Sequence, residues 1–334
     1  MIIKCLGTVR VLLVWALLAV LGCKDAPRDN PLDPLSPTPE KHSQLLVRVQ
    51  SFYPPYAPLP NVALLLSPRE TLLHTNAEGS ALFTDLAPGN YTLKAGASGF
   101  VSDSVDLEII PRTTGQHTFR LNAMPRIGEA FVYSEHISRW FPLNRDLYRL
   151  VIAARVTDAD GAQDLVTVKA TSANHGELGA LTLRPETGRY ELALTNFESP
   201  KPSLPDFLGE PLRLEASDRE GAMTHSTPLL LTRVIEPTPI AEMPAAFTST
   251  DTRPRFKWKS MTLPYHFTFR VDISQFAPEQ QFATLFESIH NISADSAAAF
   301  APRALPEGTY YWTVSIVDRQ GNLSRSKEAT FQVQ

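Results

Sequence analysis

The sequence predicts an all-β protein of three tandem β-sandwiches that follow a signal peptide and a proline-rich tether. Runs in which apolar and polar residues alternate recur from residue 42 onward, and this period of two is typical of strands that bury one face. Two turn patterns also recur, a glycine two residues before a tyrosine and an aspartate three residues before a glycine. The first occurs at Gly89, Gly188 and Gly308, and the second at Asp158, Asp218 and Asp318. Their spacing follows no strict period, which favours separate sandwiches over a repeat array.

Residues 1–22 have the layout of a secretory signal peptide. The basic residues Lys4 and Arg10 precede an apolar run over residues 11–21, and Gly22 precedes Cys23. An uncleaved membrane helix is the alternative, but a spanning helix needs about 20 apolar residues. This run is shorter and ends at once in charged and proline-rich sequence. The segment is therefore predicted to be removed from the mature protein.

The position of Cys23 resembles the lipobox of bacterial lipoproteins. The resemblance implies that the thiol of Cys23 is diacylated, that the chain is cut before it, and that the new amino group is acylated with a fatty acid such as palmitate. Two or more acyl chains hold a protein stably at a membrane, whereas a single chain binds reversibly. We therefore expect a membrane partner through a lipid anchor at Cys23.

Residues 23–41 are the predicted tether. Residues 28–34 resemble the stretch after the cysteine in many lipoproteins of Bacteroidota and neighbouring phyla, and Lys24 and Asp25 are similar to the start of their surface-export signal. A solvated charge pair is the alternative for these two residues. The resemblance implies the cell envelope, at the outer membrane, with the side of the membrane left open. The prolines of this segment favour an extended spacer that rises about 3 Å per residue.

The cysteines and the charge limit the partners and the means of stabilisation. The chain has two cysteines, Cys5 in the predicted signal peptide and Cys23 at the predicted lipid site. No disulfide is therefore expected in the mature domains, which must be stabilised by hydrophobic cores. The net charge is −4 and no basic patch is present, which argues against a nucleic-acid partner.

Residues 42–123 are predicted to form the first sandwich. Leu45, Val47 and Val49 share one face of a strand, and the alternation returns at residues 62–66 and 91–95. The motifs PNVAL at 60–64, TNAEG at 75–79, LAPGNYTL at 86–93 and SGF at 98–100 follow in order. This order resembles the carboxypeptidase regulatory-like domain, a transthyretin-like β-sandwich. The resemblance implies an accessory folding or interaction module, and the zinc peptidase that precedes this domain in some members has no counterpart in this sequence.

Residues 124–236 are predicted to form the second sandwich. Alternating runs at residues 150–156 and 212–216 each end in an Asp-x-x-Gly turn. The segment is similar to the immunoglobulin-like repeats of bacterial surface proteins, which implies a second antiparallel β-sandwich.

Residues 237–334 are predicted to form the third sandwich. Trp258 lies in an early alternating run, and Tyr310 and Trp312 lie in a late one. This pattern resembles a fibronectin type III-like sandwich, which implies that the three rings belong to its core. Residues 278–289, between the strands, are predicted as either a short helix or an irregular strand.

No catalytic set is recognisable, so we expect a non-enzymatic protein without a cofactor. The eight histidines are scattered, and the sequence has no His-Glu-x-x-His, no cysteine pair for zinc and no Gly-x-Ser-x-Gly elbow. A Ser/His/Asp set assembled from distant residues stays open, because triads need no adjacency in sequence.

Asp158, Asp160 and Asp164 are candidate calcium ligands, because alternating aspartates in a glycine turn can supply several oxygens. An EF-hand-type loop would need a further spaced acid and a later glutamate. The favoured interpretation is therefore a hairpin turn in which an aspartate accepts hydrogen bonds from its own backbone.

Two pairs of aromatic residues are candidate ligand contacts. Trp140 and Phe141 fall in a predicted loop, where exposed rings can stack on sugars or anchor a partner. The alternative is that they fill the junction between the first two sandwiches. Tyr53 and Tyr56 flank two prolines, and for them a simple turn is the alternative.

These observations predict a non-enzymatic, lipid-anchored cell-envelope protein that acts as an extended scaffold or an adhesion or binding module, with a protein or a glycan as partner. A glycan-binding accessory lipoprotein of an outer-membrane uptake system is the first alternative, favoured by exposed aromatic residues near one another at a sandwich end. A structural component of a secretion or envelope-assembly machine is the second. Fold class alone does not decide among them.

Overall fold

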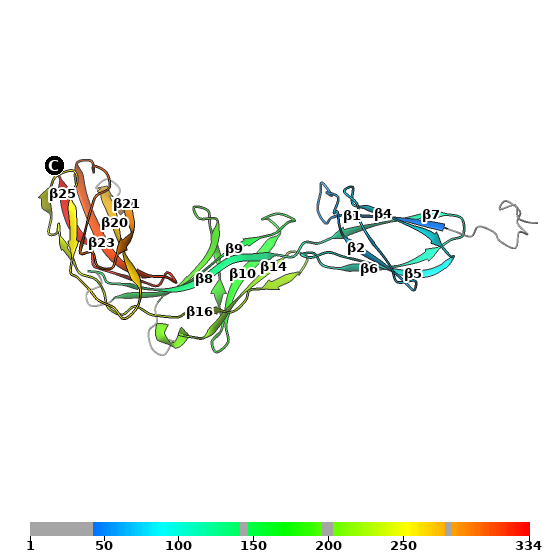
Figure 1. Cartoon of the computed structure of the whole chain (residues 1–334), viewed down its shortest axis with the longest axis horizontal. Coiled ribbons are helices and arrows are strands. Elements are labelled where there is room, and N and C mark those ends of the chain that lie inside the picture. The colour runs from blue at the N-terminus through cyan, green and yellow to red at the C-terminus, as the bar shows by residue number, and fades with distance from the viewer. Residues whose placement is uncertain (1–42, 141–145, 196–202, 278–281) are drawn as a thin grey trace, which may run out of the picture. The chain divides into compact units, whose positions relative to one another are not determined.

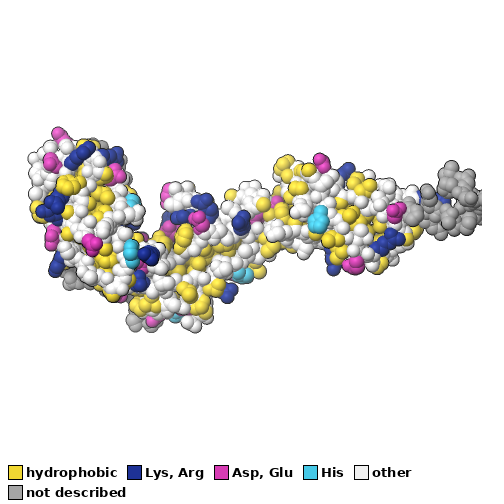
Figure 2. Space-filling view, viewed as in Figure 1, with side chains coloured by type: hydrophobic (Ala, Val, Ile, Leu, Met, Phe, Trp, Pro, Cys, Tyr) yellow, Lys and Arg dark blue, Asp and Glu magenta, His cyan; other side chains and the backbone are white. Residues whose placement is uncertain are grey.

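The computed structural model describes residues 43–140, 146–195, 203–277 and 282–334 (Figure 1). These residues form β-strands and one short 3₁₀-helix, η1 (Leu204–Phe207), which confirms the all-β prediction. None of the described residues belongs to a helix long and apolar enough to cross a membrane. The chain divides into two compact units, Met1–Asn122 and Ala123–Gln334. On the face shown in Figure 2, acidic and basic side chains are interspersed over both units.

The first unit contains a three-stranded and a four-stranded sheet, in the orders β4-β1-β7 and β3-β2-β5-β6. β1 and β7 pair in parallel, and the other neighbours are antiparallel. The strands are β1 (Ser43–Ser51), β2 (Ala63–Ser67), β3 (Thr71–His74), β4 (Ser80–Leu86), β5 (Gly89–Gly96), β6 (Asp103–Ile109) and β7 (Thr114–Leu121).

The predicted alternation in the first unit is confirmed. Leu45, Val47 and Val49 of β1 are all buried, and so are Leu64 and Leu66 of β2. These side chains belong to one hydrophobic core that the two sheets share. The resemblance to a carboxypeptidase regulatory-like domain stays a prediction.

The second unit is built on one long sheet, in the order β12-β13-β9-β8-β24-β23-β20-β21, with β25 and β18 attached through β23. Smaller sheets, β11-β10-β14-β15 with β16 and β17-β19-β22, complete it. Its first strands are β8 (Arg126–Ile137), β9 (Leu147–Thr157), β10 (Leu165–Ser172), β11 (Gly176–Ala180), β12 (Thr182–Arg184), β13 (Arg189–Leu194), β14 (Pro211–Asp218), β15 (Met223–His225) and β16 (Leu229–Leu230). The later strands are β17 (Ala241–Met243), β18 (Thr248–Thr250), β19 (Arg255–Trp258), β20 (Phe267–Ala277), β21 (Phe282–Ser293), β22 (Ala298–Phe300), β23 (Gly308–Asp318), β24 (Leu323–Arg325) and β25 (Ala329–Val333).

Two hydrophobic cores lie within the second unit. One is formed by buried side chains from Val132 to Leu231, and the other by buried side chains from Ile235 to Val333. Trp258, Tyr310 and Trp312 are at most 1% exposed in the second of these cores, as predicted. The domain boundaries predicted from the sequence stay a prediction.

Strand β21 decides between the two predictions for residues 278–289. Residues 282–289 belong to β21, which pairs antiparallel with β20, and residues 278–281 lie outside the described part of the chain. The register shifts between Phe269 and Val271 and again between Ile273 and Ser274. The irregular strand is therefore the correct alternative. Figure 1 shows β20, β21 and β23 side by side.

A parallel strand pair joins the two cores of the second unit. Residues Leu323–Arg325 of β24 pair with Glu135–Ile137 of β8, and the sheet therefore continues from one core to the other. Fully buried Asn322 accepts a hydrogen bond from the Ser134 backbone N–H at 2.9 Å. Packing in both cores therefore holds the part of the sheet where β8 and β24 pair.

Candidate functional site

Trp140 is an exposed aromatic side chain with a fixed orientation. It follows β8, and its side chain is 60% exposed. The indole Nε1 donates a hydrogen bond to the Glu328 carbonyl oxygen at 2.8 Å, and Lys327 Nζ lies 4.5 Å from the ring centroid. Trp140 is thus held by the segment between β24 and β25 while most of its surface faces solvent.

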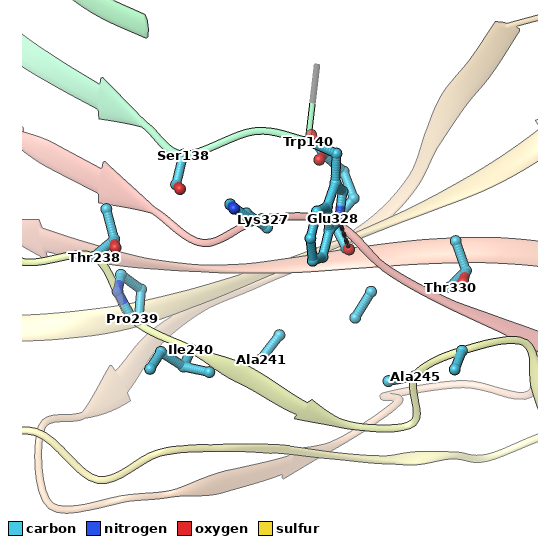
Figure 3. A pocket seen from close by; sticks show the side chains of 12 residues that line it. Ser138, Trp140, Thr238, Pro239, Ile240, Ala241, Ala245, Lys327, Glu328 and Thr330 are labelled. Carbon is cyan, nitrogen blue, oxygen red and sulfur yellow. Dashed lines mark hydrogen bonds between the residues drawn. The ribbon is translucent and has the colours of Figure 1, made fainter. Parts of the chain in front are cut away.

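A hollow of about 600 Å³ lies on one side of Trp140. Figure 3 shows the indole beside the chain at Glu328, with the side chains of residues 238–241 on a facing segment. The lining is mainly apolar and includes Ile240, which is 53% exposed. Such a surface can take a flat apolar face of a ligand.

Backbone in an unfavourable conformation lines this hollow at Ala246 and continues into Phe247, the next residue. Ala246 and Phe247 have φ values of +52° and +61°, although neither is glycine. The Phe247 N–H donates to the Thr330 carbonyl at 2.9 Å, and Trp312 Nε1 donates to the Pro244 carbonyl at 2.7 Å. Phe247 is 59% exposed. Strained backbone of this kind persists where its surroundings fix it, and it is frequent at binding sites.

A second hollow, of about 530 Å³, lies against Trp140 and contains arginine side chains. It is lined by Ile137, Arg139, Trp140, Leu147, Arg149, Arg325 and Glu328. A third hollow, of about 440 Å³, shares Ile137, Arg149 and Arg325 with it. We call these two adjoining hollows together the arginine hollow. Trp140 therefore stands between an apolar surface and a charged one.

The other predicted aromatic contacts are placed as follows. Phe141 lies outside the described residues. Tyr53 and Tyr56 lie in a turn of the first unit, where the Tyr56 N–H donates to the Tyr53 carbonyl at 3.0 Å. The Arg120 guanidinium lies 4.2 Å from the centroid of the Tyr56 ring. The role of Tyr53 and Tyr56 as ligand contacts stays a prediction. Lys327 and Glu328, which contact Trp140, belong to the third predicted sandwich.

Asp158, Asp160 and Asp164 come together at one loop, with one potential ligand atom from each within 4.8 Å of the others. Asp158 Oδ1 accepts from the Asp160 N–H at 2.8 Å, and Asp160 Oδ2 accepts from the Ala123 N–H at 2.7 Å. The first is the local bond of a turn, and the second joins the loop to the segment before β8. Burial raises the pKa of Asp158, and the hydrogen bond from the Asp160 N–H opposes this in part. The neighbouring carboxylates of Asp164, Asp160 and Asp218 also raise it, and the pKa is raised overall.

The raised pKa of Asp158 makes Asp158→Asn a stabilising substitution at neutral pH. The wild-type carboxylate must ionise at a site that disfavours its charge, whereas asparagine stays neutral and keeps the acceptor for the Asp160 N–H. We expect the variant to have the higher Tm at pH 7. The difference should shrink as pH falls through the raised pKa of the folded protein and vanish below 3.8, where the Asp158 carboxyl is protonated in both the folded and the unfolded wild type.

The same melting experiment tests calcium binding. One ligand atom from each of three carboxylates falls short of the six to eight oxygens that calcium takes, so EDTA should leave the wild-type Tm unchanged. A lower Tm in EDTA that disappears in Asp160→Ala, together with a destabilised Asp158→Asn, would contradict both expectations.

One cluster brings a serine, a histidine and a glutamate together in the second unit. Ser172 Oγ donates to Glu210 Oε1, and His175 Nε2 lies 3.3 Å from Glu210 Oε2. Burial alone would raise the pKa of Glu210, but hydrogen bonds from Ser172 and Asn174 hold it below its usual value. In a catalytic triad the imidazole contacts the serine oxygen, whereas here both side chains contact the carboxylate. The cluster closes the loop after β10.

No protein-family model matches the sequence, and neither does any curated protein. Among solved structures, the chain is similar to the major pilin subunit BcpA of Bacillus cereus, with 10% identity, a TM-score of 0.29 and coverage of 85% of this chain and 91% of that one. It is also similar to the fibronectin(III)-like modules of CbhA from Clostridium thermocellum, with 14% identity, a TM-score of 0.28 and coverage of 63% and 93%. The FN1–FN3 domains of chicken CNTN1 give 14% identity, a TM-score of 0.30 and coverage of 82% and 90%. Similarities this distant carry no argument about function.

Proposed function

We propose that this chain is a non-catalytic, lipid-anchored binding protein of the cell envelope that contacts a glycan through Trp140. The observation that carries the proposal is that Trp140 is 60% exposed and yet held by a hydrogen bond from its Nε1 to Glu328. A fixed, exposed indole beside two hollows offers a large contact area at little cost in side-chain entropy.

The chemistry around Trp140 favours a sugar over a purely apolar ligand. Sugars present apolar ring faces and hydroxyl edges, and they need a flat hydrophobic surface next to hydrogen-bonding groups. Trp140 supplies the surface, and Arg149, Arg325 and Glu328 supply donors and acceptors in the hollow beside it.

The fold supports a display role. Trp140 follows β8, and its partners Lys327 and Glu328 follow β24, the strand that pairs with β8. The pairing extends one bond beyond the strands, because the Ser138 N–H donates to the Arg325 carbonyl at 3.0 Å, and it holds the two segments that carry the site together. The tether at residues 23–41 and a lipid at Cys23 would hold this unit at the outer membrane.

Lipidation at Cys23 is tested by mass spectrometry of the detergent-extracted protein. We expect an N-terminal peptide that begins at acylated Cys23, and we expect Cys23→Ser to release the protein from the membrane or to leave it unprocessed. A mature protein that still contains an intact Met1 peptide would reject the anchor.

Glycan binding is tested with neutral and acidic polysaccharides immobilised on a sensor surface. We expect at least one polysaccharide to bind the wild-type protein, and Trp140→Ala to weaken that binding about 10-fold or more, as for a central aromatic contact. Phe300→Ala is the matched control, because Phe300 is 64% exposed and does not line the hollows.

Two results would contradict glycan binding. One is that no polysaccharide is retained, and the other is that Trp140→Ala and Phe300→Ala bind like the wild type. Absence of any carbohydrate binding together with a stable stoichiometric protein partner would favour the envelope-assembly alternative.

A further inference from the structure

The arginine hollow extends over the outer face of the long sheet. The side chains of Phe269, Val271 and Ile273 point into the core and are fully buried. Residues between them on β20 face the other way by alternation, and Arg270 is one that lines the hollow. Ser274 and Thr313 line it too, although they are only 6% and 2% exposed. The floor is therefore polar and largely shielded from bulk water.

Three arginines from three different strands line this part of the hollow, Arg149 on β9, Arg270 on β20 and Arg325 on β24. Each makes one ion pair: Arg149 with Glu135, Arg270 with Asp272 at 2.9 Å and Arg325 with Glu328 at 2.6 Å.

The guanidinium groups have donors to spare, because each carries five N–H groups. The Nε atoms of Arg149 and Arg325 are buried and have no hydrogen-bond partner within the described part of the chain. A buried charged donor without an acceptor is costly, but these two Nε atoms are out of reach of water. An oxyanion in the hollow would instead be met by the other N–H groups of the two side chains, which are 34% and 26% exposed.

The charge balance of the hollow favours an anion. Over the whole hollow the lining has four arginines, Arg139, Arg149, Arg270 and Arg325, and three carboxylates, Glu135, Asp272 and Glu328. Both oxygens of Asp272 already accept a hydrogen bond, Oδ2 from Arg270 and Oδ1 from Ser288 at 2.7 Å. The whole chain, by contrast, has a net charge of −4. The hollow thus has an excess of positive charge on a protein that is negative overall, and this excess favours an anionic ligand.

The position of Trp140 sets the rest of the ligand. Arg149 and Arg325 line both the sheet-face part of the hollow and the part that contains Trp140. A ligand that fills both parts would therefore place an oxyanion against the arginines and the apolar face of a neighbouring ring against Trp140. The planar guanidinium fork suits carboxylate and sulfate oxygens, which it binds through two parallel hydrogen bonds.

We propose that the arginine hollow binds the oxyanion groups of an acidic polysaccharide, with Arg149 and Arg325 on the anion and Trp140 on the neighbouring sugar ring. The inference rests on the proposed function, because the ring contact is the same Trp140. The oxyanion is either the carboxylate of a uronic acid or a sulfate ester, and the experiment separates these sources.

The test measures binding of the full-length, detergent-solubilised protein to immobilised polygalacturonate, dextran sulfate and neutral dextran. We expect at least one acidic polymer to bind about 10-fold or more tightly than neutral dextran near 0.15 M salt, with the difference shrinking as salt rises. Preference for polygalacturonate identifies a uronate, and preference for dextran sulfate identifies a sulfate ester.

Variants locate the effect. Arg149→Gln with Glu135→Gln removes both members of one ion pair, so no unpaired carboxylate is left in the hollow. Arg325→Lys keeps the charge but not the planar fork. Each should weaken binding of the acidic polymer about 10-fold and leave the Tm close to that of the wild type. Arg303→Gln is the matched control, because Arg303 also pairs with a glutamate, Glu287 at 2.7 Å, but does not line the hollow.

The outcomes separate this inference from the proposed function. Equal binding of neutral and acidic polymers, reduced by Trp140→Ala only, would overturn the arginine proposal and leave glycan binding intact. Acidic binding that falls equally in Arg303→Gln would be general charge attraction and would also overturn it. Retention of no polymer at all would overturn both.

Discussion

Replacing Trp258 with alanine is expected to lower the free energy of unfolding of its core by about 3–5 kcal/mol. Trp258 is 1% exposed, and its ring centroid lies 5.2 Å from that of Phe269. Removing the indole leaves a large cavity that the surrounding strands β19 and β20 cannot fill. Because a domain has only about 5–15 kcal/mol in total, the variant should lose most of its near-ultraviolet signal at moderate temperature.

Trp258→Phe is the matched control for this prediction. Trp258 Nε1 is buried without a hydrogen-bond partner among the described residues, so phenylalanine removes an unpaired donor and keeps much of the ring volume. Its cost should be clearly smaller than that of alanine. Limited proteolysis should cut residues 237–334 of Trp258→Ala first. Unchanged stability in Trp258→Ala, with loss of a binding activity, would mean that Trp258 is exposed and functional.

The sequence predicts which face of each strand is buried far better than it predicts strand partners. The alternation around Leu45 and around Trp312 identified core positions correctly, because a period of two fixes the side-chain direction. The pairing of β24 with β8 was not predicted. It brings Asn322 onto Ser134, 188 residues earlier, and alternation carries no information about which strand lies next.

The candidate site shows the same limit. Trp140 was recognisable as an apolar residue in a predicted loop, but its partners Lys327 and Glu328 come from a distant segment. The arginines of the hollow were missed entirely. Arg149, Arg270 and Arg325 occupy outward strand positions, where a charged residue ordinarily indicates a solvated face, and only the joined sheet turns that face into a hollow.

The recurring Asp-x-x-Gly turns are also only partly equivalent. At both Asp218 and Asp318 the glycine N–H donates to the aspartate carbonyl, at 3.4 and 3.2 Å, and Gly221 and Gly321 have positive φ. Both carboxylates also accept from a backbone N–H four residues on. Asp318 also accepts a hydrogen bond from Arg233 Nη1, at 3.0 Å. Its turn therefore joins the two cores of the second unit.

Asp318→Ala is accordingly expected to cost about 3–5 kcal/mol, the usual effect of removing one partner from a buried ion pair. The Asp318 side chain is fully buried and also accepts from Asn322 Nδ2 at 2.9 Å. Its loss leaves the Arg233 charge, stacked on the Tyr265 ring at 3.8 Å, without this carboxylate. With about 2–4 °C per kcal/mol for a unit of this size, the Tm should fall by roughly 6–20 °C.

Asp218→Ala separates the turn from the ion pair, since it removes the matching turn bond to the Ala222 N–H at 2.7 Å. It should cost about 1–2 kcal/mol, the range for one hydrogen bond lost from a buried turn. Hydrogen exchange adds a measurement that a defect confined to the turn would not change. The Ser134 N–H, bonded to Asn322 Oδ1, should exchange faster in Asp318→Ala and at the wild-type rate in Asp218→Ala. Equal Tm losses in the two variants, with Ser134 protected in both, would show that Asp318 stabilises its own turn and not the junction of the two cores.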